Sequence, residues 1–143
     1  MIVFEHISKT FQGQTHAVRD LNLKIEDGQT LILLGTSGSG KTTSMKMVNR
    51  LIEPTRGRIL IDSKDITKSD PVKLRRDIGY AIQHIGLFPH MNVAENIAVV
   101  PKLLNWNSKK ISDRIDKLLD LVGLEPADFR QRYPHQLSGG QKQ

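Results

Sequence analysis

The feature that most constrains this 143-residue chain is a glycine-rich stretch of nine residues, Gly35-Thr36-Ser37-Gly38-Ser39-Gly40-Lys41-Thr42-Thr43. It fits the pattern G-x-x-x-x-G-K-[ST], in which a loop between a strand and a helix holds phosphate groups. The apolar run from Thr30 to Leu34 predicts a strand buried on both faces. Apolar side chains at helical spacing predict a helix from Thr42 to Ile52. The expected order is therefore strand, loop, helix.

The chemistry of a phosphate site follows from this order. Glycines let the backbone bring its N–H groups close to phosphate oxygens, and the start of the helix adds unpaired N–H groups. We expect Lys41 to reach the β- and γ-phosphates and the Thr42 hydroxyl to be a ligand of Mg²⁺. The alternative is an ordinary Gly/Ser turn before a helix. We favour the phosphate site because strand and helix are both expected in the right places.

Composition excludes several classes of protein. No apolar run approaches the ~20 residues of a membrane helix, and Met1 leads straight into a strand-like stretch, so we expect neither a membrane span nor a signal peptide. The chain has no cysteine, and its five histidines lack ligand spacing, so we expect no disulfide and no transition metal. The net charge of +6 could indicate nucleic acid or a membrane surface. Because the basic residues are dispersed, we expect no nucleic-acid partner.

The first half of the chain predicts several strands. Residues 2–7 and 21–26 are strand-like, with a polar loop over residues 8–15 between them. Residues 58–62 and 78–82 are two further strands. Asp62 ends one of them, as the Mg²⁺-binding aspartate does in P-loop enzymes, but the Ser63 that follows favours a turn. We adopt the turn.

Helices dominate the second half. We expect helices over residues 72–77, over residues 93–100 until Pro101 ends the helix, and over residues 108–122. The last of these has Ser108 as its cap, Gly123 as its end and an apolar stripe formed by Ile111, Ile115, Leu118, Leu119 and Val122. The sequence therefore predicts a mixed α/β part with the phosphate loop over residues 1–83 and a helical part over residues 84–143.

A second motif, Leu137-Ser138-Gly139-Gly140-Gln141, ends the helical part. Together with the phosphate loop it resembles the nucleotide-binding subunit of ATP-binding cassette (ABC) transporters, and the resemblance covers the whole chain. The resemblance implies an α/β P-loop NTPase fold of the ABC ATPase type. In that fold a mixed sheet surrounds the P-loop helix, antiparallel strands precede it, and an α-helical subdomain, partial here, follows.

The same resemblance implies roles for single residues. Phe11 falls where the family stacks an aromatic ring on adenine, although it could be a loop aromatic packed on the core. Gln83 matches the glutamine that contacts Mg²⁺ and the attacking water, although it could be a polar strand end. The second motif would bind the γ-phosphate of ATP held by a partner subunit, through Ser138, Gly139, Gly140 and Gln141. Two copies would thus sandwich two ATP molecules as a homodimer.

Two further stretches, residues 46–55 and 100–106, resemble the subgroup of importers for glycine betaine, carnitine, choline and related osmoprotectants. This resemblance implies membrane-spanning permease subunits as partners and a substrate-binding protein as an indirect one. The subunit would lie in the cytoplasm, peripheral on the inner face of the cell membrane. Its docking surface is expected around residues 83–95.

The resemblance also implies what residues 1–143 lack. The family's Mg²⁺-binding aspartate, catalytic glutamate and γ-phosphate histidine follow the second motif, and no residue of this chain matches them. We therefore assign no catalytic residue, and expect the chain alone to bind nucleotide without turning it over. We also expect apolar faces near the phosphate loop to be exposed.

Two alternatives stay open. One is a non-transport member of the superfamily that acts on DNA or ribosomes. Such members carry zinc modules or long coiled coils between the glutamine and the second motif, and this interval holds neither cysteine nor a long heptad run. The other is a non-catalytic module that binds a partner subunit.

Overall fold

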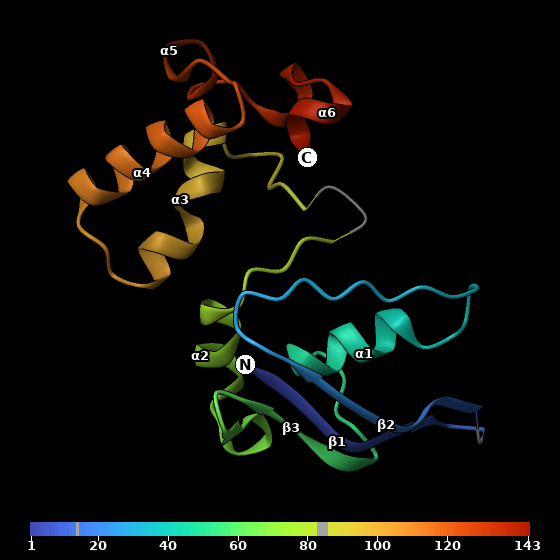
Figure 1. Ribbon diagram of the computed structural model, residues 1–143. Helices are drawn as coiled ribbons and strands as arrows, with labels where there is room; N and C mark the ends of the chain where they lie inside the picture. The colour runs from blue at the N-terminus through green and yellow to red at the C-terminus, as the bar shows by residue number, and fades with distance from the viewer. Residues whose placement is uncertain (14, 83–85) are drawn as a thin grey trace. The chain divides into compact units, whose positions relative to one another are not determined.

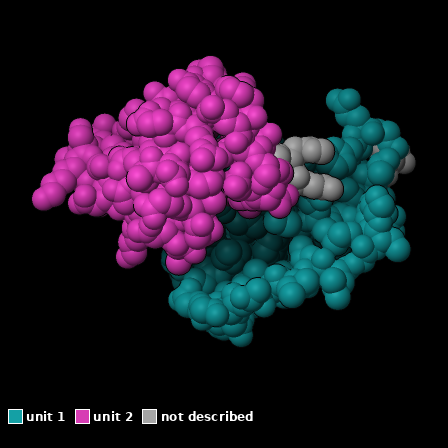
Figure 2. Space-filling model, turned by 90° about the horizontal axis from the view of Figure 1, so that it is seen from above, with its two compact units in different colours: residues 1–79 teal, residues 80–143 magenta. Residues whose placement is uncertain are grey.

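The structure is a computed structural model and describes residues 1–13, 15–82 and 86–143. The chain forms two compact units, residues 1–79 and 80–143, shown in teal and magenta in Figure 2. The boundary predicted between residues 83 and 84 lies outside the described residues.

Unit 1 is built on a four-stranded antiparallel sheet with the strand order β2-β1-β3-β4 (Figure 1). Its strands are β1 (Ile2–Phe11), β2 (Thr15–Ile25), β3 (Arg56–Ile61) and β4 (Lys64–Asp65). The two predicted N-terminal strands are confirmed and are longer than expected. The loop predicted over residues 8–15 is wrong, because the ladder between β1 and β2 continues to the pair Phe11 and Thr15.

One face of this sheet packs on the helix α1 (Lys41–Val48), as Figure 1 shows. Apolar side chains from three strands meet Met47, which is fully buried. This burial is the main stabilising contribution in unit 1. The buried members of this core are Phe4, Ile7, Val18, Met47, Ile59 and Ile66.

A tight turn at Asp62 and Ser63 joins β3 to β4. Both residues have left-handed backbone angles, φ 48° and 64°. Two such residues match the twist of a two-residue hairpin, in which aspartate is favoured. The turn adopted for Asp62 from the sequence is confirmed.

Two predicted strands are absent from the described residues. Neither Thr30–Leu34 nor Ile78–Ile82 is paired in the sheet. Without a neighbouring strand, backbone groups have no ladder to join, so the apolar run alone does not produce a strand. Ile32 is 72% exposed and Leu34 88%, which agrees with the expectation of exposed apolar faces near the phosphate loop.

The two helices of unit 1 differ slightly from their predicted bounds. The helix α1 ends at Val48 rather than at Ile52, because Arg50 adopts a left-handed conformation with φ 50°. The helix α2 (Pro71–Asp77) starts one residue earlier than predicted. Its N-cap is Asp70, whose carboxylate accepts hydrogen bonds from the N–H groups of Val72 (2.8 Å) and Lys73 (2.9 Å).

These two bonds make a prediction about pH. The N–H groups of Lys73 and Val72 hold the pKa of Asp70 below its ordinary value of 3.8. A carboxylate with a lowered folded pKa stabilises the fold above about pH 4, and that stabilisation is lost as the pH falls through the folded value. Asparagine caps a helix without titrating. We therefore expect any stability advantage of the wild type over Asp70→Asn at about pH 6 to shrink as the pH falls below about 4, measured by urea denaturation. A difference that does not change with pH would contradict this assignment.

Unit 2 is helical. Its elements are α3 (Val93–Leu103), α4 (Ser108–Leu121), α5 (Pro126–Phe129), the 3-10 helix η2 (Pro134–Gln136) and α6 (Gly139–Lys142). Three residues of the predicted stripe of α4 are buried against Ala98 of α3, namely Ile111, Ile115 and Leu119. Val122 was predicted to extend this stripe but is 65% exposed, because the helix ends before it.

The structure tests three predictions about helix ends. Pro101 was predicted to end α3 but lies inside it. The helix continues because proline removes one hydrogen bond near the end, while the Leu104 N–H still bonds the Val100 carbonyl (3.0 Å). The cap of α4 is Asn107, which accepts a bond from the Lys110 N–H (2.8 Å), so the prediction of Ser108 is wrong by one residue.

The stop at Gly123 is confirmed. Its φ of 72° is left-handed, its N–H bonds the Asp120 carbonyl (3.0 Å), and the Leu124 N–H bonds the Leu119 carbonyl (2.9 Å). This pair of bonds is a Schellman motif, in which glycine is favoured.

The start of α3 is bonded to a distant segment. The N–H groups of Val93 and Ala94 donate to the carbonyls of Arg132 (2.9 Å) and Arg130 (3.0 Å). Asn92 caps the same turn through Glu95 (2.8 Å). The first turn of α3 is thus satisfied partly by residues almost 40 positions later in the chain.

Within the described ranges, no helix has the length and apolar character needed to cross a membrane.

Candidate phosphate-binding site

The glycine-rich loop meets the sheet at Gly40, the residue before α1. Gly40 has φ 91°, and a Cβ atom added to it would lie 2.3 Å from the Ala17 carbonyl oxygen of β2. No side chain fits there, so glycine lets the start of α1 approach the sheet. Ser44 and Met47, both buried, hold the following turns against the core.

Lys41 folds back over the loop that precedes it. Its Nζ donates to the carbonyl oxygens of Gly35 and Thr36, each at 2.7 Å, and lies 3.1 Å from the Ser39 hydroxyl. A Cβ atom on Gly35 would lie 2.7 Å from that same hydroxyl oxygen, which explains glycine at this end of the loop. The ammonium group is thereby held at the mouth of the loop.

Backbone donors gather at the start of α1. The Ser39 N–H bonds the Thr36 carbonyl (3.3 Å), and the Ser44 N–H bonds the Gly40 carbonyl (2.8 Å). Among the described residues, the N–H groups of Lys41, Thr42 and Thr43 have no acceptor. Unpaired N–H groups, the positive end of the helix dipole and one ammonium group together suit a bound phosphate.

The residues also fit a magnesium ion that is bound together with phosphates. Within residues 1–13, 15–82 and 86–143, no group of three His, Asp or Glu side chains could hold a metal by itself. Mg²⁺ usually keeps several waters and takes one or two protein ligands beside substrate phosphates. The exposed Thr42 hydroxyl, at the start of α1, can be such a ligand. Gln83, the second predicted ligand, lies outside the described residues.

Phe11 lies at the end of β1, opposite Thr15 on β2. Its ring is 41% exposed and does not belong to the core of unit 1. The Lys9 ammonium lies 5.1 Å from the ring centroid. The same β2 strand carries Ala17, whose carbonyl faces Gly40, so the hairpin connects the aromatic ring to the phosphate loop. An exposed ring on this hairpin is available for stacking.

The second glycine motif lies in unit 2, where Ser138 caps α6. The Gln141 N–H donates to the Ser138 hydroxyl (3.3 Å), and the Ser138 N–H donates to the Gln141 side chain (2.9 Å). A Cβ atom on Gly139 or Gly140 would meet nothing within 4 Å of the described structure, and neither glycine is left-handed. The fold of this chain therefore gives no reason for either glycine, whereas close approach of another molecule would.

A cavity of about 500 Å³ lies beside this motif, entirely within unit 2. Its walls are mostly apolar side chains from α3, α4 and the segments outside these helices, and Lys142 is the one charged side chain among the described lining residues. Such walls offer little to a triphosphate. The polar chemistry is at the start of α1 instead.

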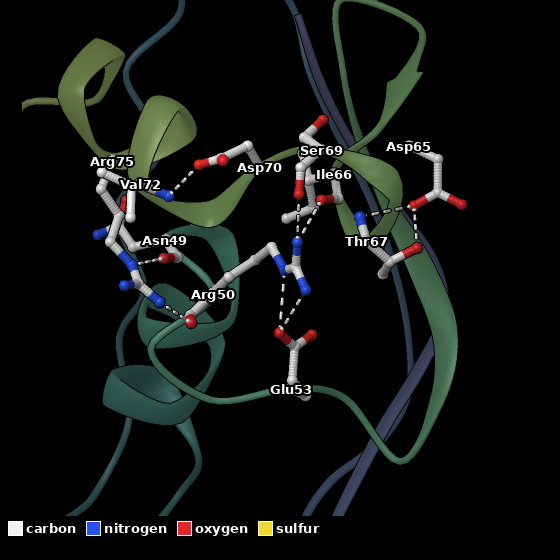
Figure 3. A network of polar contacts seen from close by, with 10 residues as sticks. All are labelled: Asn49, Arg50, Glu53, Asp65, Ile66, Thr67, Ser69, Asp70, Val72 and Arg75. Carbon is white, nitrogen blue, oxygen red and sulfur yellow. Dashed lines mark hydrogen bonds and ion pairs between the residues drawn. The ribbon is translucent and has the colours of Figure 1, made fainter.

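The polar contacts at the other end of α1 were not predicted from the sequence. Two arginines, Arg50 and Arg75, donate to backbone carbonyls there (Figure 3). The phosphate motif ends before them, and an arginine in a basic helix carries no local signal that it bonds a residue 25 positions earlier.

Comparison with known proteins identifies a family and several relatives that resemble this chain. The profile of a family described as ABC transporter matches residues 18–143. The carnitine transport ATP-binding protein OpuCA of Listeria monocytogenes serotype 1/2a (strain 10403S) is 57% identical over all 143 residues, which cover 36% of that relative. The glycine betaine uptake system ATP-binding protein YehX of Escherichia coli (strain K12) is 54% identical over the same residues, which cover 46% of it. The chain thus spans less than half the length of these curated relatives.

Among solved structures, the dimeric ATP-binding cassette MJ0796 bound to ADP and Pi has a TM-score of 0.85 to this chain at 31% identity. The match covers 99% of this chain and 65% of that one. The fold class predicted from the sequence is confirmed.

Proposed function

Since this chain belongs to the ABC transporter family, we propose that it is the ATP-binding part of an importer for a quaternary amine osmoprotectant. The observation that carries the proposal is the geometry at the start of α1. There, an anion site lies at the end of the glycine-rich loop. It is formed by the Lys41 ammonium group and by three backbone N–H groups that have no acceptor among the described residues.

The site residues divide the work of holding ATP. The backbone N–H groups of Lys41, Thr42 and Thr43 would bind phosphate oxygens, while Lys41 would supply positive charge to the β- and γ-phosphates. To do so, its Nζ exchanges carbonyl partners for phosphate oxygens, which are stronger acceptors because they are charged. The Phe11 ring stacks on adenine. Thr42 and Gln83 would hold Mg²⁺, which would neutralise charge on the phosphates.

We assign the second glycine motif to a partner copy. Ser138, Gly139, Gly140 and Gln141 of one subunit contact the γ-phosphate of ATP held by the other, so that a homodimer encloses two ATP molecules. The open space around both glycines supports this assignment. The similar cassette MJ0796, which is dimeric and bound to ADP and Pi, also supports it.

The importer assignment rests on the relatives named for transport of carnitine and glycine betaine. In the proposed assembly, permease subunits span the membrane, a binding protein delivers the solute, and this subunit lies on the inner face. The whole protein hydrolyses ATP. Residues 1–143 supply the phosphate-binding loop of its site.

Uptake in cells tests the proposed function. In a host without other osmoprotectant uptake, deleting the gene is expected to abolish the salt-stimulated uptake of labelled glycine betaine, carnitine or choline. Uptake of methionine, a solute without a quaternary amine, is the control and should not change. Unchanged uptake of all three quaternary amines would refute the importer. Specific retention of the purified protein on DNA or ribosomes would then favour the non-transport alternative.

A further inference from the structure

The helix that carries the phosphate site is short, so its position depends on its anchors. The eight residues of α1 span about 12 Å. A helix of this length is unstable by itself in water, and tertiary contacts decide where it lies. Any contact that holds one end of α1 therefore influences where the N–H groups at the other end point.

Arg75 of α2 holds the C-terminal end of α1 (Figure 3). Its Nε donates to the Asn49 carbonyl (3.0 Å), and its Nη2 donates to the Arg50 carbonyl (2.6 Å). Carbonyls at this end of a helix have no partner within the helix. A guanidinium group supplies both missing donors in one rigid fork, and its charge complements the negative end of the helix dipole.

Arg50 extends this contact beyond α1. Its side chain, 15% exposed, donates to the carbonyls of Ile66 (3.1 Å) and Ser69 (2.7 Å) and pairs with Glu53 (2.8 Å). Its backbone is left-handed, with φ 50°. A non-glycine residue keeps this conformation only when its surroundings hold it. The bond from Arg75 to its carbonyl is one such constraint.

The two arginines thus form a closed connection. Arg75 joins α2 to the end of α1, and Arg50 joins that end to the segment just before α2. Asp70 fixes the start of α2 in the same network. No residue of α2 is buried, so these polar bonds and the partly buried Leu74 are what attach it.

From this geometry we infer that Arg75 is a positioning residue for the phosphate site. By fixing the far end of α1, it keeps the N–H groups of Lys41 to Thr43 aimed at the triphosphate before the nucleotide arrives. The inference rests on the proposed ATP binding and extends it to a residue that contacts no nucleotide. A preorganised site binds more tightly because less ordering remains to be done on binding.

The test compares full-length variants in nucleotide binding at a temperature well below their unfolding midpoints. Arg75→Met keeps the length of the side chain but removes both donors, and we expect its Kd for Mg·ATP to rise about tenfold. Arg75→Lys keeps the charge and can bond one carbonyl at a time, so we expect a rise of about threefold. The matched control is Lys73→Met on the same helix. Lys73 is exposed and has no side-chain partner among the described residues, so its affinity should stay within about twofold.

The outcomes separate the positioning role from a merely structural one. If Arg75→Met lowers the unfolding midpoint but binds Mg·ATP as tightly as the wild type, the positioning role is wrong. If Arg75→Met does not fold, Arg75→Lys decides, and wild-type affinity in that variant overturns the inference. If the wild type itself binds no Mg·ATP, the proposed function fails and the positioning role falls with it. This failure can be told apart from failure of the positioning role, because both outcomes for the Arg75 variants are measured against a wild type that binds Mg·ATP.

Discussion

Replacing Lys41 with alanine is expected to weaken Mg·ATP binding about a hundredfold. The variant loses the one ammonium group at the mouth of the loop, which lies 2.7 Å from the Gly35 and Thr36 carbonyls. A charged hydrogen bond contributes about 1.5–3 kcal/mol, and this ammonium group can bond two phosphates, so the combined loss is about 3 kcal/mol. Isothermal titration with Mg·ATP measures the change directly. The affinity for adenosine, which has no phosphate, should not change.

Lys46→Ala is the matched control for this experiment. It removes the same charge from the same helix, but Lys46 lies in the last turn of α1, away from the loop. We expect its affinity to stay within about twofold of the wild type, because Lys46 is partly exposed to solvent and lies more than one helical turn from Lys41, where water and salt weaken the effect of its charge. If a folded Lys41→Ala variant bound Mg·ATP within about threefold of the wild type, the phosphate site would be misassigned.

Replacing Gly57 with alanine is expected to destabilise the fold by about 4 kcal/mol. Gly57 has φ 81°, and an added Cβ atom would lie 2.4 Å from the carbonyl oxygens of both Glu5 and His6. These are backbone atoms of the central strand β1, so relieving the overlap means moving β3 away from the sheet. Urea denaturation of the full-length protein gives the free energy of unfolding.

Gly28→Ala separates the steric cost from the cost of the backbone angle. Gly28 has a similar φ of 76°, but an added Cβ atom would meet nothing within 4 Å. We expect this variant to lose about 1–2 kcal/mol, the cost of a left-handed alanine. Equal losses in the two variants would show that the close approach of β3 to β1 does not carry the effect.

The phosphate loop was predictable because its chemistry is local. The fixed glycines and Lys41 are needed at set spacings, and the structure gives a steric reason for Gly35 and Gly40. The long helix α4 was predictable for a similar reason, since its apolar stripe and the stop at Gly123 lie within one stretch of sequence. Its N-cap was not, because asparagine and serine at neighbouring positions cap equally well.

The strands divide into two groups. The hairpin of β1 and β2 forms between neighbours in sequence, and its alternating pattern revealed it. The apolar runs at Thr30–Leu34 and Ile78–Ile82 satisfy the same local rule, yet the described residues provide no strand to pair with them. A strand depends on its partners, and composition alone does not supply them.

The polar contacts of α1 were beyond sequence reasoning altogether. The bond from Arg75 to the Arg50 carbonyl joins residues 25 positions apart, and nothing in the basic run around Arg75 distinguishes it from Arg76. Whether the residues predicted to contact ATP do so stays a prediction, and the Lys41 and Arg75 variants test it.

The first turn of α3 has a consequence for synthesis. Its N–H groups at Val93 and Ala94 donate to the carbonyls of Arg132 and Arg130, their acceptors among the described residues. During translation, residues 130–132 are synthesised after the whole of α4. The first turn of α3 therefore lacks these two acceptors until that later segment has been made. Unit 2 is therefore expected to consolidate in one late step of translation rather than helix by helix.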